Sequence, residues 1–233
     1  MKKILFYFSI LFFFGSCVTM KVQDITPKGR NSILLPTLTP HVDIKSFENT
    51  YFNLSPVIIE SRPVFYGTDL WGVDILETRA FADADPRIQD AVSIFMKDVK
   101  DNITDPYGEK QGDILCRITF GDVNSRGLAW FYLSSLTLYI PNLLGMPIMS
   151  NRANIELELQ IFDINKKLIK RYQADCTNKK YVALYWGSNY PTAARKANAA
   201  AFKCAMYKIK KQIENDAPEI IKKLQKANEL GKK

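Results

Sequence analysis

The chain has 233 residues, of which 47% are hydrophobic, 24% charged and 12% aromatic. This composition excludes a disordered or fibrous chain, and the length allows one domain with a short appendage. The formal net charge is +8, and it falls to +6 when Lys2 and Lys3 of the leader are removed.

Residues 1–16 predict a secretory signal peptide. Two lysines precede an apolar run over residues 4–14, which is too short to cross a bilayer stably. The small residues of Gly15-Ser16-Cys17 resemble a bacterial lipobox, although Phe14 stands where leucine is usual.

The lipobox resemblance implies cleavage before Cys17 and acylation of that cysteine, palmitate included, which gives a firm membrane anchor. Val18 stands where an aspartate often marks inner-membrane retention in the family pattern, and no acidic run follows. We therefore expect an anchor in the outer membrane, facing the periplasm. An ordinary signal peptide with a coincidental cysteine, or an uncleaved anchor, is the alternative.

Residues 17–30 are expected to form the lipidated cysteine and a tether, because the stretch is polar and Pro27 interrupts it. Residues 31–233 are expected to form a single domain. Its first part predicts short strands and loops, with Ser32–Leu35 and Val57–Ile59 as the most extended pieces.

The first helix is predicted over residues 86–103. Asp85 can cap its amino terminus and Pro86 suits the first helical position. Apolar residues recur at spacings of three, four and seven, which predicts one buried face. That face contains Ile88, Ala91, Val92, Phe95, Met96, Val99 and Ile103. A turn is expected at residues 105–108.

Alternation over residues 113–120 predicts a strand, and a polar glycine loop is expected at residues 121–127. The strand's inward side is expected to hold Ile114, Cys116, Ile118 and Phe120. The strongest β pattern is a hairpin, in which residues 155–161 and 168–176 flank a turn at residues 163–167.

A second helix is predicted over residues 191–214. Pro218 is expected to end it, because proline interrupts the helical hydrogen bonds, and a last amphipathic helix follows. Small residues let the second helix approach a sheet closely along Ala194, Ala197, Ala201, Cys204, Ala205, Ile209 and Ile213. The order of elements predicts an α+β fold, with two or three helices on one face of a mainly antiparallel sheet.

Residues 128–149 contain no charged residue. Length alone permits a membrane-spanning helix, but Pro141, Pro147 and several polar side chains argue against one. The segment is otherwise interpreted as a buried connector, as an exposed apolar loop that contacts lipid or a partner chain, or as a hairpin in a small pore. The candidate contact residues are Trp130, Phe131, Tyr132 and Tyr139.

The basic excess is concentrated at the carboxyl end, where residues 203–233 hold nine lysines and four acidic residues. These lysines form either a solvated helix surface or a face that attracts an anionic lipid or cell-wall polymer. Lys222, Lys223 and Lys226 are the candidate contact residues.

With Cys17 lipidated, Cys116, Cys176 and Cys204 remain, and three cysteines cannot all pair within one chain. The periplasm permits disulfides. Cys116 is therefore expected either to pair with Cys176 or to remain, like the others, a buried thiol.

The sequence contains no motif for catalysis, for a metal or for a cofactor. His41 is the one histidine, and the motifs GxSxG, GxxxxGK[ST] and GxGxxG do not occur. Aspartates flank the first predicted helix, and we interpret them as structural rather than as a calcium or acid/base site. They are Asp83, Asp85 and Asp90 at its start, and Asp98, Asp101 and Asp105 at its end. Export argues against nucleic acid as a partner.

Several segments resemble uncharacterised bacterial outer-membrane lipoproteins: the lipobox, Asp85–Asp90, Pro106–Lys110, and Ala183–Gly187 before an alanine-rich helix. More loosely, the layout is similar to TolB amino-terminal-type periplasmic α/β domains. Accessory lipoproteins of peptidoglycan synthesis, exopolysaccharide export and curli export use such domains. The resemblance implies no particular activity, cofactor or functional residue.

These features lead us to expect a non-enzymatic, lipid-anchored accessory or binding protein of the envelope, whose partner is a protein or a cell-wall polymer. The alternative is an oligomeric outer-membrane export component that places residues 128–149 in a pore or ring interface. A third hypothesis is an envelope hydrolase that uses a carboxylate such as Asp83.

Overall fold

A computed structural model describes residues 20–27, 29–52, 67–68, 74–75, 85–126, 128–183 and 187–231. The predicted signal peptide, Cys17, Asp83 and the extended piece at residues 57–59 lie outside these ranges. The elements in chain order are α2 (Val22–Ile25), β1 (Leu38–Val42), α3 (Ile44–Phe52), β2 (Gly67–Thr68), β3 (Asp74–Ile75), α4 (Pro86–Asp98), η2 (Val99–Ile103), β4 (Gly112–Arg126), α5 (Leu128–Leu136), α6 (Ile140–Leu143), β5 (Met149–Asp163), β6 (Leu168–Val182) and α7 (Tyr190–Gly231).

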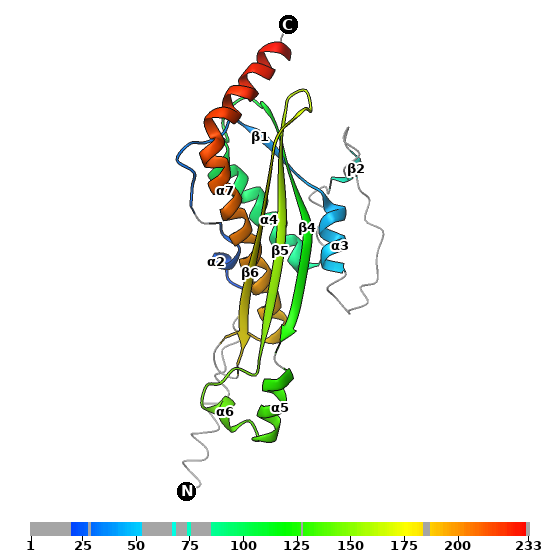
Figure 1. Cartoon of the computed structure of the whole chain (residues 1–233), viewed down its shortest axis with the longest axis vertical. Coiled ribbons are helices and arrows are strands. Elements are labelled where there is room, and N and C mark those ends of the chain that lie inside the picture. The colour runs from blue at the N-terminus through cyan, green and yellow to red at the C-terminus, as the bar shows by residue number, and fades with distance from the viewer. Residues whose placement is uncertain are drawn as a thin grey trace.

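The main sheet has the strand order β1-β4-β5-β6 (Figure 1). Strands β4, β5 and β6 form an antiparallel meander, whereas β1 pairs with β4 in parallel. The predicted α+β fold is confirmed, with a mixed sheet. Strand β1 is parallel because α3 and α4 lie between it and β4 in the chain, and such a crossover returns the chain in the same direction.

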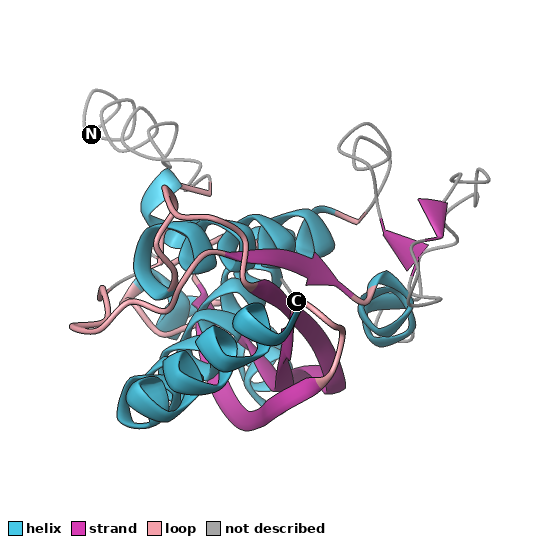
Figure 2. Cartoon of the chain, turned by 90° about the horizontal axis from the view of Figure 1, so that it is seen from above, coloured by secondary structure: helices cyan, strands magenta, loops and turns pink. Residues whose placement is uncertain are grey.

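Helix α7 lies along one face of the sheet on β5 and β6, and α4 packs beside α7 (Figure 2). Helix α3 packs against β4 instead, just past the end of β1. There Ser46 Oγ accepts a hydrogen bond of 3.1 Å from the backbone N–H of Ile118, on the side of β4 where the pairing with β1 has ended at Cys116. The expected arrangement of helices on one face is therefore found for α4 and α7.

The predicted hairpin is confirmed, with β5 and β6 each running for 15 residues. At its turn, Lys166 adopts a positive φ of 66° and the backbone N–H of Lys167 donates to Asp163 Oδ1 at 2.8 Å. Alternate residues of β5 face the helices, and Leu157 and Leu159 are fully buried there. The alternation of apolar and polar residues in the sequence therefore places the apolar residues on one face of the sheet and the polar residues on the other.

Strand β4 differs from its predicted form in two ways. A bulge between Ile118 and Phe120 turns the Phe120 side chain away from the core, where it is exposed. The strand then continues to Arg126, so the loop expected at residues 121–127 is wrong. A Cβ at Gly121 would lie 2.2 Å from Thr50 Cγ2, so glycine there lets α3 pack closely against the strand.

The first predicted helix is confirmed as α4 and η2, the latter a π-helical last turn. Asp85 Oδ1 accepts from the backbone N–H of Arg87 at 2.8 Å and caps the helix, and Pro86 takes its first position. At the other end, the N–H of Thr104 donates to the carbonyl of Val99, five residues back. Of the predicted apolar face, only Met96 lies at the surface.

Helix α7 runs unbroken through Pro218, so the predicted helix end at that residue is wrong. Proline removes its own backbone hydrogen bond and crowds the carbonyl four residues back, a cost of about 3 kcal/mol that tertiary packing can offset. Ile213, Ala217, Ile220 and Leu224 are buried on either side of it and hold the helix in place. At 42 residues, α7 is about 60 Å long.

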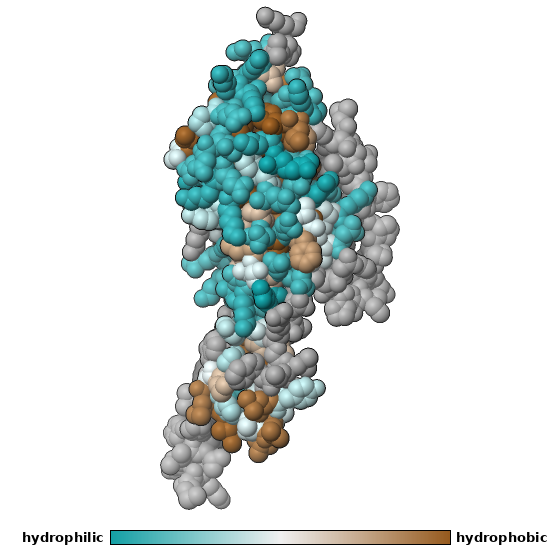
Figure 3. Space-filling model, viewed as in Figure 1, coloured by the Kyte–Doolittle hydropathy of each residue, from teal (hydrophilic) through white to brown (hydrophobic). Residues whose placement is uncertain are grey.

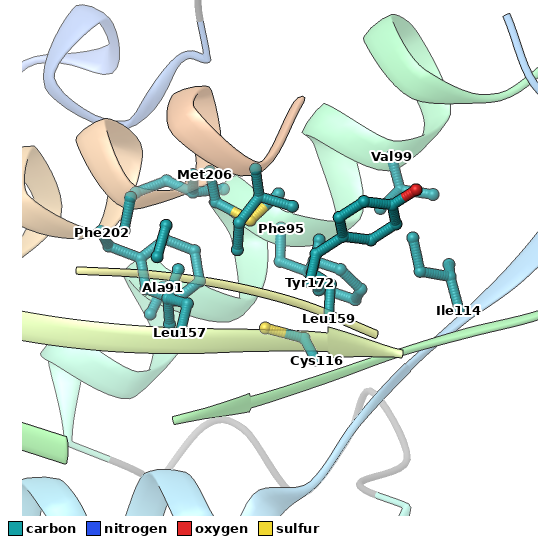
Figure 4. Close-up of a cluster of buried hydrophobic side chains, with 14 of the residues drawn as sticks. Ala91, Phe95, Val99, Ile114, Cys116, Leu157, Leu159, Tyr172, Phe202 and Met206 are labelled. Carbon is teal, nitrogen blue, oxygen red and sulfur yellow. The ribbon is translucent and has the colours of Figure 1, made fainter. Parts of the chain in front are cut away.

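The core fills the space between the sheet and the two helices. Phe95 of α4 and Phe202 and Met206 of α7 point toward Leu157 and Leu159 of β5 (Figure 4). Each large side chain buried this way contributes about 1.5–3 kcal/mol to folding. The small residues predicted along the second helix let α7 approach the strands, since Ala197, Ala201 and Ala205 are fully buried.

A disulfide joins Cys176 of β6 to Cys204 of α7. The predicted pairing of Cys116 with Cys176 is wrong, because β5 lies between the strands that carry these residues. The reading of Cys116 as a buried thiol is confirmed. Burial raises the pKa of this thiol well above its usual value.

Candidate functional site

Helices α5 and α6 form a lobe that projects beyond the ends of the strands (Figure 1). The chain leaves β4 into α5, turns at residues 137–139, and returns through α6 into β5. We call residues 128–148 the tip. It is the uncharged stretch of the sequence, now placed at one end of an elongated molecule.

The tip is held together by its own hydrogen bonds. The N–H of Tyr139 donates to the carbonyl of Ser134 at 2.7 Å, and Thr137 Oγ1 donates to the carbonyl of Leu133 at 2.8 Å. Asn142 Nδ2 donates to the carbonyl of Met146 at 3.1 Å. These bonds to backbone carbonyls stabilise the lobe from within, and the buried Asn142 Oδ1 has no hydrogen-bond partner among the described residues.

Burial in the tip is inverted relative to a normal domain. Among residues 132–148, the buried side chains are the polar Ser134 and Asn142. Exposed apolar side chains are Tyr132, Leu133, Leu136, Leu138, Tyr139, Ile140, Leu143 and Leu144. Figure 3 shows the apolar surface at this end. The buried-connector interpretation is therefore wrong, since a patch of this kind marks a contact surface.

The structure places two of the four predicted aromatic contact residues on this surface. Tyr132 is 67% exposed and Tyr139 is 37% exposed. Trp130 and Phe131 belong to α5, and the structure does not describe their side chains. Tyr132, Leu133, Ser135 and Leu136 line an open hollow. Across the residues that the structure describes, no helix is long and apolar enough to cross a membrane.

Basic side chains border the tip at the ends of β5 and β6. Arg152 and Lys179 lie directly opposite each other in the strand pairing, and both are exposed. Lys179 Nζ also lies 4.8 Å from the centre of the Tyr181 ring. Arg152 is three residues from the first residue of β5, about 10 Å from the tip. The arrangement is an apolar end with a basic border.

The segment expected to be a tether is packed against α7 from Met20 onward. It contains the short helix α2, and Met20 and Ile25 contact the core. Lys203 Nζ donates to the backbone carbonyls of Gln23 and Asp24, both at 3.1 Å. Lys196, near the start of α7, lies 3.5 Å from the Asp24 carboxylate. The amino-terminal segment therefore enters the fold along the half of α7 that is closer to the tip.

The predicted lysines lie at the opposite end of the molecule, where α7 extends toward the carboxyl terminus (Figure 1). Lys223 pairs with Glu219 at 2.6 Å. Lys222 and Lys226 are exposed, and neither forms an ion pair with another described residue. The fold thus separates the two groups of candidate contact residues instead of bringing them together.

A polar cluster that the sequence analysis missed surrounds Asp113 at the start of β4. Its carboxylate lies 3.0 Å from His41 Nε2, 2.7 Å from Lys110 Nζ and 2.8 Å from Lys166 Nζ. Burial alone would raise the pKa of Asp113, but these hydrogen bonds outweigh it and hold the pKa well below its usual range. The ionised form therefore stabilises the fold above about pH 4, and that contribution is lost as the pH falls through the lowered pKa.

The aspartates around α4 are engaged in structural contacts. Asp85 caps the helix, Asp90 binds Arg195 through two hydrogen bonds, and Asp98 binds Lys210 at 2.7 Å. Within the described ranges, no group of three or more His, Cys, Asp or Glu side chains is placed to hold a metal ion. Arg195 and Lys210 lie more than 100 residues from Asp90 and Asp98 along the chain, so the sequence gives no sign of these two pairings.

The fold can be compared with known proteins. No family model matches the chain, and neither does any curated protein. Among solved structures, it is similar to the crystal structure of a putative lipoprotein from Caulobacter crescentus CB15. The sequence identity is 11%, over 60% of this chain and 78% of that chain, and the TM-score is 0.28. At that TM-score the match adds no argument, so the resemblances to outer-membrane lipoproteins and to TolB-type domains stay predictions.

Proposed function

We propose that this protein is a non-enzymatic lipoprotein, anchored in the periplasmic leaflet of the outer membrane through acylated Cys17, that binds an anionic envelope partner. The observation that carries the proposal is the opposite character of the two ends of the molecule. One end is the uncharged tip, and the other is the lysine-bearing end of α7.

The position of α2 relates these ends to the membrane. Three residue steps separate Cys17 from Met20, and they span at most about 10 Å. Because α2 contacts Lys196 near the start of α7, a lipid on Cys17 holds the tip end toward the bilayer. Helix α7 then carries its carboxyl end away from the membrane.

The far end suits an anionic partner, an acidic protein surface or a cell-wall polymer. Lys222 and Lys226 supply exposed positive charge that the described residues do not neutralise. Asp90 and Asp98, two of the aspartates considered as an acid/base site, form ion pairs with Arg195 and Lys210.

Replacing Cys17 with alanine is expected to abolish lipid attachment, because no other residue can take the acyl groups of a processed lipobox. Metabolic labelling with a palmitate analogue should label the native protein, which should fractionate with the outer membrane, and should not label the variant. Cys116→Ala is the matched control and should keep its label. Equal labelling of native protein and Cys17→Ala would refute the anchor.

Reversing the charge of Lys222 and Lys226 to glutamate is expected to weaken partner binding at least tenfold, because two attractive charges become repulsive. Co-sedimentation with purified peptidoglycan at low salt is the measurement, with envelope protein complexes as the second probe. The control is Lys97→Glu with Lys100→Glu, which changes the net charge equally on exposed parts of α4 and η2. Equal loss in both variants, or in neither, contradicts this contact surface.

A second candidate function is an oligomeric outer-membrane export component with residues 128–149 in a pore or ring interface. The exposed apolar surface of α5 and α6 favours it, because such a surface also fits a second copy of the chain. The native mass in mild detergent, corrected for bound detergent, tests it. The mass of one lipidated chain rejects the ring, whereas a discrete multiple supports it.

A further inference from the structure

Three leucines of the tip are largely exposed to solvent. Leu136 is 83% exposed, Leu138 is 80% exposed and Leu144 is 84% exposed. Leu138 and Tyr139 both have positive φ values, of 49° and 59°. A turn of this shape favours glycine or asparagine, yet it carries a leucine and a tyrosine. Covering these large apolar side chains would remove their surface from water and is therefore favourable.

The basic border of the tip indicates what that contact is. Arg152 and Lys179 lie opposite each other across β5 and β6, and like charges in that position repel. An anion placed between them removes the repulsion. The apolar tip has the chemistry of the acyl-chain region of a membrane, and the two cations lie about 10 Å from it. In a membrane surface, the phosphate headgroups lie at a similar distance above the acyl chains.

The amino-terminal segment brings the tip end of the molecule close to a bilayer. Lys196 and Lys203 fix α2 beside the first half of α7, and the short reach from Met20 to Cys17 keeps the acyl chains at this end of the molecule. A bilayer is then within reach of the tip without any change in the fold.

From these observations we infer that the tip inserts into the phospholipid leaflet that holds the acyl chains of Cys17. The inference rests on the proposed function, since the lipid anchor brings that leaflet to the tip. The tip side chains enter the upper acyl region, and Arg152 and Lys179 contact the phosphates. The protein thus touches the membrane at two points, which fixes its orientation instead of leaving it on a free tether.

The test uses the full lipidated chain carrying Leu136→Cys, labelled with an environment-sensitive nitrobenzoxadiazole dye. The label is selective, because Cys116 is buried and Cys176 and Cys204 form a disulfide. The protein is placed in vesicles of phosphatidylethanolamine and phosphatidylglycerol, with a nitroxide lipid as quencher near the start of the acyl chain. The matched control is Leu168→Cys, an exposed leucine at the other end of the sheet.

We expect blue-shifted emission at position 136 and quenching several times stronger than at position 168. Equal quenching at the two positions overturns the inference. A blue shift at position 136 without lipid quenching also overturns it, because the label is then covered by protein, as in a ring. If both labelled chains stay on the vesicles and position 136 is not quenched, the Cys17 anchor holds the protein and the tip does not insert. If both are released, the proposed anchoring itself fails.

Discussion

Replacing Lys210 with methionine is expected to lower the free energy of unfolding by about 3–5 kcal/mol, because it leaves a buried carboxylate without its counter-charge. Lys210 Nζ lies 2.7 Å from Asp98 Oδ1, and the two side chains are 3% and 2% exposed. Lys210 also donates to the carbonyl of Gly29 at 2.8 Å, and Asn102 donates to Asp98 at 2.6 Å. The pair therefore joins α7 to α4 and to the segment that follows α2.

The double variant Lys210→Met with Asp98→Leu is expected to recover most of that loss, because apolar side chains of similar size need no counter-charge. Urea unfolding of the two single variants and the double variant at neutral pH gives the coupling energy. Lys211→Met, an exposed neighbour on the same helix, is the control and should change stability by less than about 0.5 kcal/mol. A loss below about 1 kcal/mol in Lys210→Met would show that the pair is not needed.

Breaking the disulfide between Cys176 and Cys204 is expected to lower the free energy of unfolding by about 3–4 kcal/mol. The bond closes a loop with a sequence separation of 28, and its removal frees that loop in the unfolded chain. It also links β6 to α7 directly. Oxidised protein and Cys176→Ser with Cys204→Ser are compared by urea unfolding, with and without a thiol reductant.

The reductant should destabilise the oxidised native protein and leave the double serine variant unchanged. Cys116 takes no part in this response, because its thiol is buried and unpaired. If the reductant has the same effect on both proteins, the cross-link contributes nothing to stability. A disulfide-linked peptide that contains Cys116 in a digest of the unreduced protein would contradict the pairing.

Local patterns in the sequence were sufficient for the long helices and the hairpin. The cap at Asp85 and the apolar spacing from Ile88 to Ile103 predicted α4 and η2, since helical contacts lie within four residues of one another. The alternation in residues 155–161 and 168–176 predicted the hairpin and its faces for the same local reason. The absence of charge in residues 128–149 marked the candidate site before any fold was known.

Elements whose form depends on distant partners were not predictable in this way. The bulge after Ile118 depends on how β4 pairs with β5, and the continuation of α7 through Pro218 depends on buried neighbours on the sheet. The partner of Cys176 is set by which element lies beside β6. Asp98 and Lys210 are 112 residues apart, so no local pattern links them.

The sequence by itself therefore determined α4, the hairpin of β5 and β6, the α+β class and the uncharged segment, because these follow from the period and composition of neighbouring residues. Only the tertiary structure decided that this segment faces outward, with Ser134 and Asn142 inside and leucines outside. Exposure is a property of the whole chain, since an apolar stretch is buried only if another part of the fold covers it. Here α5 and α6 project beyond the ends of β4 and β5 (Figure 1), and the described residues leave Leu136, Leu138 and Leu144 largely uncovered.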